Sequence, residues 1–155
     1  MIESWNGTSW SIVPSPRLSG SLFSVSCVSA ASCMAAGFSR TSSGNAVVLI
    51  ESWNGRRWSV ALSASGSGVI ESVSSVSATA CIATGDYSTG GNPITLVESW
   101  NGTSWSIVPS PNLGTNSYLY GPHPYGSARR MLGSPRAGRC VARPGSLAWW
   151  PARWA

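Results

Sequence analysis

A repeated segment of fourteen residues is the feature that most constrains how this chain can fold. The segment ESWNGTSWSIVPSP runs from Glu3 to Pro16 and recurs without change from Glu98 to Pro111. A diverged copy, ESWNGRRWSVALSA, begins at Glu51, so the copies start 48 and then 47 residues apart. A fixed period of this length is typical of chains built from stacked supersecondary units. The sequence therefore predicts an array of one repeated unit.

The repeat extends beyond this motif, and its pattern is that of β-strands. Residues 23–38 align with residues 71–86. Within 47–53 alternate residues point to opposite sides, Val47, Leu49, Glu51 and Trp53 to one and Val48, Ile50 and Ser52 to the other, which is the two-residue period of a strand. Two further strands are predicted at 22–28 and 33–38, so each unit offers four short strands.

An Asn-Gly pair inside each copy of the motif predicts a tight hairpin. Both residues of such a turn adopt positive φ, which Asn and Gly tolerate best. One tryptophan precedes and one follows each turn, so the two rings are expected to meet across the hairpin. The predicted pairs are Trp5 with Trp10, Trp53 with Trp58, and Trp100 with Trp105.

Four antiparallel strands in just under 50 residues match the size of a β-propeller blade. We therefore predict an all-β fold of tandem four-stranded antiparallel blades, about two and a half units of a propeller-like array that does not close. The predicted divisions are a first unit at 1–49, a second at 50–96, a partial third at 97–118 and a tail at 119–155.

The combination of ESWNGxxW with VSCVSxxSCxAxG resembles the repeats of a family of bacterial exported proteins. These are described as kelch-like or galactose-oxidase-like β-propellers. The resemblance covers roughly residues 2–118 and implies a fold and a location outside the cytoplasm, without implying a reaction. Such a protein is expected to carry an apolar leader. Met1 runs directly into the repeat, so we expect either a leader upstream of an internal start or a chain that is a fragment of a longer gene.

The tail differs from the repeats in charge and pattern. Residues 1–120 carry four Arg and five acidic residues, whereas 121–155 carry six Arg and no acidic residue. The strand pattern stops near Tyr120, so we expect this Arg/Pro/Gly-rich segment to be disordered or to be read from a shifted frame. Nucleic-acid binding through Arg and Trp is the alternative, but the segment lacks a recognisable binding motif.

Cysteine positions support the same location. Cys27 and Cys33 flank a short predicted turn, so a disulfide between them is expected. A metal site is the competing interpretation, but no further Cys lies nearby and the chain has a single His, His123. Free thiols are the alternative for a cytosolic protein. We predict no metal and no cofactor, and no run of apolar residues is long enough for a transmembrane helix.

A catalytic constellation is not evident. Glu3, Glu51 and Glu98 occupy one repeat position, and a residue present in every unit more often has a structural role. A glycosidase needs two carboxylates in one cleft, and nothing in the spacing brings Glu71 and Asp86 together. We therefore predict that the protein is not an enzyme.

Two functional classes follow, with a third explanation beside them. The first is a noncatalytic exported or cell-surface scaffold that binds a protein or a cell-wall component. The second is a lectin-like propeller in which the six repeat tryptophans named above stack on sugar rings, the competing role being core packing. The third is a truncated gene remnant without a function of its own. Open strand edges predict self-association in every case.

Overall fold

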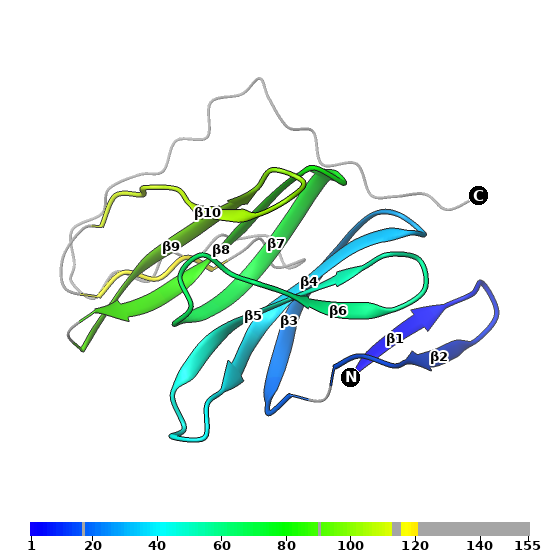
Figure 1. Cartoon of the computed structure of the whole chain (residues 1–155), viewed down its shortest axis with the longest axis horizontal. Coiled ribbons are helices and arrows are strands. Elements are labelled where there is room, and N and C mark those ends of the chain that lie inside the picture. The colour runs from blue at the N-terminus through cyan, green and yellow to red at the C-terminus, as the bar shows by residue number, and fades with distance from the viewer. Residues whose placement is uncertain (17, 90, 113–115, 121–155) are drawn as a thin grey trace.

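The chain forms ten β-strands and no helix in the residues that the structure, a computed structural model, describes: 1–16, 18–89, 91–112 and 116–120. Figure 1 shows them as separate groups of antiparallel strands. In chain order they are β1 (Ile2–Trp5), β2 (Trp10–Val13), β3 (Gly20–Ser29), β4 (Ser32–Arg40), β5 (Ala46–Trp53), β6 (Trp58–Ala61), β7 (Val69–Ser77), β8 (Ala80–Thr89), β9 (Asn92–Trp100) and β10 (Trp105–Ile107).

The hairpins and their tryptophan pairs form as predicted, but four residues, 54–57 in the second hairpin, lie between the paired tryptophans in place of a two-residue turn. In the second one, Trp53 pairs with Trp58 across β5 and β6. The side-chain Oδ1 of Asn54 accepts hydrogen bonds from the backbone N–H of Arg56 and Arg57, at 3.0 and 3.1 Å. Gly55 follows with a φ of 88°, in the region that glycine adopts with least strain. The same turn closes β1–β2 and β9–β10, so this motif determines its local structure wherever it occurs.

The strands form two four-stranded antiparallel sheets and one separate hairpin. The first sheet has the order β3-β4-β5-β6, the second has the order β10-β9-β8-β7, and β1 pairs only with β2. The two sheets share their register, including a shift after Leu22 and an equivalent shift after Ile70. The prediction of an all-β chain of four-stranded antiparallel sheets is therefore confirmed, and these sheets do not close into a ring among the described residues.

The repeated motif ends each sheet. The β5–β6 hairpin contains the Glu51 copy of the motif, and its strand β5 pairs with β4 along its whole length, from Cys33 opposite Trp53 to Arg40 opposite Ala46. A linker, residues 62–68, then leads to β7. Each sheet thus combines the last strands of one sequence unit with the hairpin that begins the next. The hairpin joins the preceding strands because β5 pairs with β4 over all of its residues.

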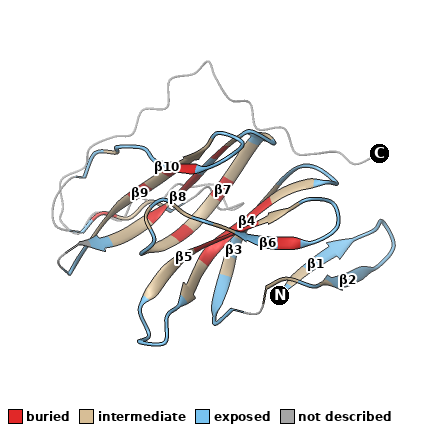
Figure 2. Cartoon of the chain, viewed as in Figure 1, coloured by how far each residue is buried: buried red, intermediate tan, exposed pale blue. Residues whose placement is uncertain are grey.

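The core lies between the two sheets, and Figure 2 shows buried positions along the central strands of both. Met34, Ala36 and Ile50 of the first sheet pack against residues of the second sheet. The second sheet contributes Ile70, Val73, Cys81, Ala83, Leu96 and Trp105. Alternation of side chains along each strand places these residues on the facing surfaces, and their burial holds the two sheets together.

Hydroxyl groups join the sheets at the edge of this core. The Oγ of Ser24 accepts a hydrogen bond from the backbone N–H of Val73 at 3.1 Å, and the Oγ of Ser26 accepts one from the N–H of Ser75 at 3.0 Å. These N–H groups belong to the edge of β7 that has no partner strand. The serines of β3 thus accept hydrogen bonds from N–H groups that would otherwise be buried between the sheets without a partner.

The predictions for the Arg-rich tail fall outside the described residues from Gly121 onward. Its preceding segment, 116–120, runs beside the second sheet, where the backbone N–H of Ser117 donates to the carbonyl of Pro93 at 2.9 Å. This bond matches the one from the N–H of Gly68 to the carbonyl of Ala46, at 3.3 Å. Ser117 therefore lies, relative to the second sheet, where Gly68 of the linker lies relative to the first sheet.

Candidate functional site

Three tryptophan pairs lie on the three hairpins, positioned by the Asn-Gly turns. The ring centroids are 5.4 Å apart in Trp5–Trp10, 5.6 Å in Trp53–Trp58 and 5.6 Å in Trp100–Trp105, with similar tilts. Their exposure differs: Trp5 and Trp10 are 50% and 66% exposed, whereas Trp58 and Trp105 are 8% and 5% exposed. The same local motif therefore yields one open aromatic pair and two that are largely covered.

The covered pairs also carry structural hydrogen bonds. The indole Nε1 of Trp53 donates to the carbonyl of Ala30 at 2.9 Å. The equivalent Nε1 of Trp100 donates to the carbonyl of Ala78 at 3.1 Å. These bonds fix the turn between the first two strands of each sheet to the hairpin that ends the sheet. Of the six candidate tryptophans, Trp5 and Trp10 are the two whose rings are open enough to stack on a ligand.

The repeated glutamate has three different surroundings. Glu98 is fully buried and accepts hydrogen bonds from three groups of the linker: the Oγ of Ser63 at 2.7 Å, the N–H of Ser65 at 2.9 Å and the N–H of Ala64 at 3.3 Å. This carboxylate ties the linker to the second sheet. The role is structural, as the presence of the residue in every unit suggests.

Glu51 occupies the equivalent position in the first sheet, with 1% exposure, but its Oε2 has no hydrogen-bond partner among the described residues. The segment before β3 has Pro16 at the position that Ala64 holds in the linker, and proline lacks an N–H. Burial raises the pKa of Glu51, and the N-terminal ammonium partly opposes this. Glu3, the third copy, is exposed on the separate hairpin.

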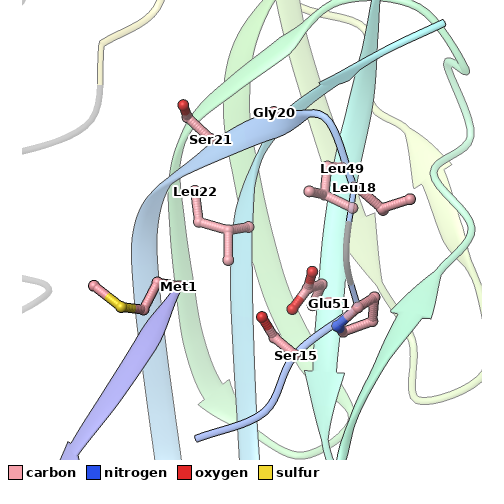
Figure 3. A pocket seen from close by; sticks show the side chains of 9 residues that line it. Met1, Ser15, Leu18, Gly20, Ser21, Leu22, Leu49 and Glu51 are labelled. Atoms are coloured by element: carbon pink, nitrogen blue, oxygen red, sulfur yellow. The ribbon is translucent and has the colours of Figure 1, made fainter. Parts of the chain in front are cut away.

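A small cavity lies beside Glu51, and Figure 3 shows the carboxylate with Ser15, Leu18 and Leu49 around it. Its volume is about 40 Å³. Small-molecule sites usually have roughly 300 Å³ or more. The cavity can therefore accommodate water-sized groups, but it is too small for a sugar ring or a cofactor.

Glu71 and Asp86, which sequence spacing did not bring together, are neighbours across β7 and β8. Val69 pairs with Asp86 and Ile70 pairs with Gly85. Glu71 is the next residue of β7 and lies where the register shifts. Burial, together with the charge of Glu71, raises the pKa of Asp86 to about 6. Sequence spacing gave no reason to bring these carboxylates together, but the β7–β8 pairing sets Asp86 opposite Val69, two residues before Glu71. The two register shifts between the turn and Asp86 are not evident in the sequence, so counting back from the Ala78-Thr79 turn does not give the observed pairing.

Two tyrosines lie near this carboxylate pair. The rings of Tyr118 and Tyr120 stack with centroids 6.1 Å apart. Burial raises the pKa of Tyr120, and the charges of Glu71 and Asp86 raise it further. No group of three or more His, Cys, Asp or Glu side chains able to hold a metal ion occurs in the part of the chain that the structure describes. The carboxylate pair and the two tyrosines therefore form a polar cluster without a metal-binding set among these residues.

Cys27 and Cys33 form the predicted disulfide, with their Cα atoms 4.0 Å apart across β3 and β4. The equivalent positions in the second sheet are Ser75 and Cys81. There the Ser75 hydroxyl donates to the Cys81 sulfur, and burial raises the pKa of the Cys81 thiol. The first sheet is therefore cross-linked at the position where the second sheet has a hydrogen bond.

In the described residues, no helix has the length and apolar character needed to cross a membrane. Comparison with known proteins adds no neighbour: no family model, no curated protein and no solved structure matches this chain.

Proposed function

We propose that this protein is a noncatalytic repeat scaffold, exported or displayed at the cell surface, whose four-stranded sheets act as blades of a propeller-like array. The observation that carries this proposal is the hydrogen-bonding of Glu98 to three groups of the linker at 2.7–3.3 Å. A side chain that defines the repeat is used to join consecutive units. Binding specificity is then left to the loops and exposed side chains that differ between units.

The disulfide supports a location outside the cytoplasm. Cys27 is exposed, and a disulfide at an exposed site persists in an oxidising compartment. The cytosolic thiol pool reduces most such bonds. We infer that the chain works where no glutathione pool reaches it.

Trapping thiols in intact cells tests this location. Cells expressing the chain are treated with an alkylating agent, fractionated, and the protein is analysed by mass. We expect the protein in the extracytoplasmic fraction to have Cys27 and Cys33 unalkylated. Both cysteines should become alkylated only after the disulfide is reduced. Recovery of the protein in the cytosol with both cysteines alkylated would overturn the proposed location.

Pull-down separates a protein partner from a cell-wall ligand. The purified chain is incubated with isolated cell-wall polymer and, separately, with extracted surface proteins. Saturable retention on either material is expected for a scaffold. Release of product from these materials, with no retained complex, would contradict a noncatalytic role.

A lectin-like function is the second candidate, favoured by the open pair Trp5–Trp10. Aromatic faces stack on the apolar faces of sugar rings, and these two rings are exposed and 5.4 Å apart. Binding to immobilised glycans should be lost in the double variant Trp5→Ala, Trp10→Ala. The matched control is Ile12→Ala on the same hairpin, a side chain that is 67% exposed. Equal binding by both variants, or none by the unaltered chain, would remove this candidate.

A further inference from the structure

The contact between the two sheets has two halves, and the chain presents each half a second time. The first half is the surface of β3 and β4, where Ser24 and Ser26 lie opposite Ala36 and Met34. The second half is the edge of β7, whose Val73 and Ser75 donate their N–H groups to those serines. Because the sheets repeat in the same register, each half has an equivalent on the other sheet.

The first half recurs on the far surface of the second sheet. Here Ser72 and Ser74 lie opposite Thr84 and Ile82, which occupy the positions of Ala36 and Met34. Ile82 is 45% exposed, whereas Met34 is 7% exposed. No hydrogen bond to the Ser72 or Ser74 hydroxyl is formed within the described residues. This surface, Ser72, Ser74, Ile82 and Thr84, is called the serine face below.

The second half recurs at the open edge of the first sheet. Val25 and Cys27 of β3 occupy the positions of Val73 and Ser75, opposite Ala35 and Cys33. The shared register therefore directs their N–H groups away from β4. Val25 is 59% exposed, whereas Val73 is 5% exposed. This part of β3, residues 23–27, is called the β3 edge below.

The chain's own continuation does not supply what the serine face needs. Ser117 occupies the position of Gly68, as its hydrogen bond to Pro93 shows. Counting forward from Ser117 by the spacing from Gly68 to Val73 and Ser75 reaches Pro122 and Pro124, which lie outside the described residues. Proline has no N–H to donate. Two prolines at this spacing offer no N–H groups for the two bonds that join β3 to β7.

We propose that the serine face binds the β3 edge of a second copy of this chain. The hydroxyls of Ser72 and Ser74 accept hydrogen bonds from the N–H groups of Val25 and Cys27 of that copy, and the side chain of Val25 packs near Ile82. The two surfaces differ, so the contact is heterologous and leaves one serine face and one β3 edge free at the ends of each assembly. Association therefore continues beyond a dimer, into a ring if the rotation closes. This inference does not depend on which ligand the scaffold binds.

Two segments lie near the proposed contact, residues 116–120 and the β1–β2 hairpin. Residues 116–120 lie beside the start of β7, where the charge of Glu71 affects Tyr120. The β1–β2 hairpin comes before the first sheet in the chain, as the β5–β6 hairpin comes before the second. The β9–β10 hairpin of the second copy has the same sequence as the β1–β2 hairpin. Neither segment forms a strand pair with a four-stranded sheet, but the bond from the Ser117 N–H to the Pro93 carbonyl holds residues 116–120 to β9.

Variants that block one surface each provide the test. Ile82→Arg blocks the serine face, and Val25→Arg blocks the β3 edge. Val60→Arg is the matched control, because Val60 is 47% exposed on β6, away from both surfaces. Circular dichroism and a cooperative melt first establish that every variant folds. Molar mass is then measured by light scattering over a hundredfold range of protein concentration.

We expect the unaltered chain and Val60→Arg to grow in mass with concentration, and each blocked variant to remain a monomer. An equimolar mixture of the two blocked variants should form a dimer and no larger species, since each retains one functional surface. The milder double variant Ser72→Ala, Ser74→Ala should associate about tenfold more weakly. A monomeric unaltered chain, association of the blocked variants equal to that of the control, or a mixture that stays monomeric would each overturn the proposal.

Discussion

Replacing Glu98 by glutamine removes one charge from the core and leaves the shape of the side chain unchanged. The carboxylate is fully buried, and its Oε1 accepts bonds from the Ser63 hydroxyl at 2.7 Å and the Ser65 N–H at 2.9 Å. Its Oε2 accepts the N–H of Ala64 at 3.3 Å. In the variant Glu98→Gln, an amide group faces these three donors.

The expected loss of stability follows from these contacts. A hydrogen bond to a charged group contributes about 1.5–3 kcal/mol and one between neutral groups about 0.5–1.5 kcal/mol, so the two bonds to Oε1 lose roughly 1 kcal/mol each. The amide NH₂ in place of Oε2 can no longer accept the N–H of Ala64. Relief from burying a charge offsets part of this loss. We expect the free energy of unfolding to fall by about 2 kcal/mol in total.

Glu51→Gln is the matched control, because Glu51 has the same repeat position and 1% exposure. Its Oε2 has no hydrogen-bond partner in the described structure. Burial raises the pKa of Glu51, which favours the neutral form of the side chain. Neutralising this side chain should change the free energy of unfolding by less than about 0.5 kcal/mol, or stabilise the fold.

Urea and thermal unfolding at pH 7 distinguish the two positions. For a chain of this size, 2 kcal/mol corresponds to a decrease in Tm of roughly 4–8 °C. We expect this decrease for Glu98→Gln and little change for Glu51→Gln. Equal losses at both positions, or a larger loss at Glu51, would refute the assignment of Glu98 as the residue that joins linker and sheet.

Three further predictions concern other repeat positions. Since burial and Glu71 raise the pKa of Asp86 from 3.8 to about 6, the folded state binds this proton more tightly than the unfolded chain; its stabilising contribution is complete below about pH 4 and is lost as pH rises through 6. Asp86→Asn should therefore be more stable than the unaltered chain at pH 7.5 but not at pH 4 in urea titrations, and an advantage independent of pH would contradict this. Ser75→Cys should form a disulfide with Cys81 in the register of the existing one, so that thiol titration finds one free thiol fewer than in the unaltered chain; one thiol more would show that the bond does not form. Gly102→Ala should lower the Tm more than Gly7→Ala, because a Cβ at Gly102 would lie 2.7 Å from the Cγ2 of Thr79 whereas Gly7 has no atom within 4 Å; equal Tm values would show that only φ matters.

Sequence reasoning predicted strands, hairpins and the cross-strand disulfide because each depends on residues close together in the chain. The alternation in 47–53 and the Asn-Gly pairs are local signals. Cys27 and Cys33 are linked across a short turn, so their proximity also follows from local structure. How the hairpins group into sheets depends on which long strands pair, and the motif alone does not report this.

The candidate site was harder to predict for the same reason. Glu71 and Asp86 are 15 positions apart in the sequence, and only the register of β7 on β8 makes them neighbours. The serine pair Ser24 and Ser26 resembles ordinary strand surface in the sequence. Its role at the sheet contact depends on the position of β7, 49 residues later.

The two identical segments separate local from tertiary information. Both fold into the same hairpin, with tryptophan rings 5.4 and 5.6 Å apart, because the Asn-Gly turn and the strand residues act within ten positions. Yet Trp10 is 66% exposed and Trp105 is 5% exposed, although their neighbours in sequence are the same. The strand β9 pairs with β8 inside a packed sheet, whereas β1 pairs only with β2. The sequence determined the hairpin, and only the tertiary structure decided whether its tryptophan and glutamate became core or surface, because burial requires a second sheet to exclude water from them.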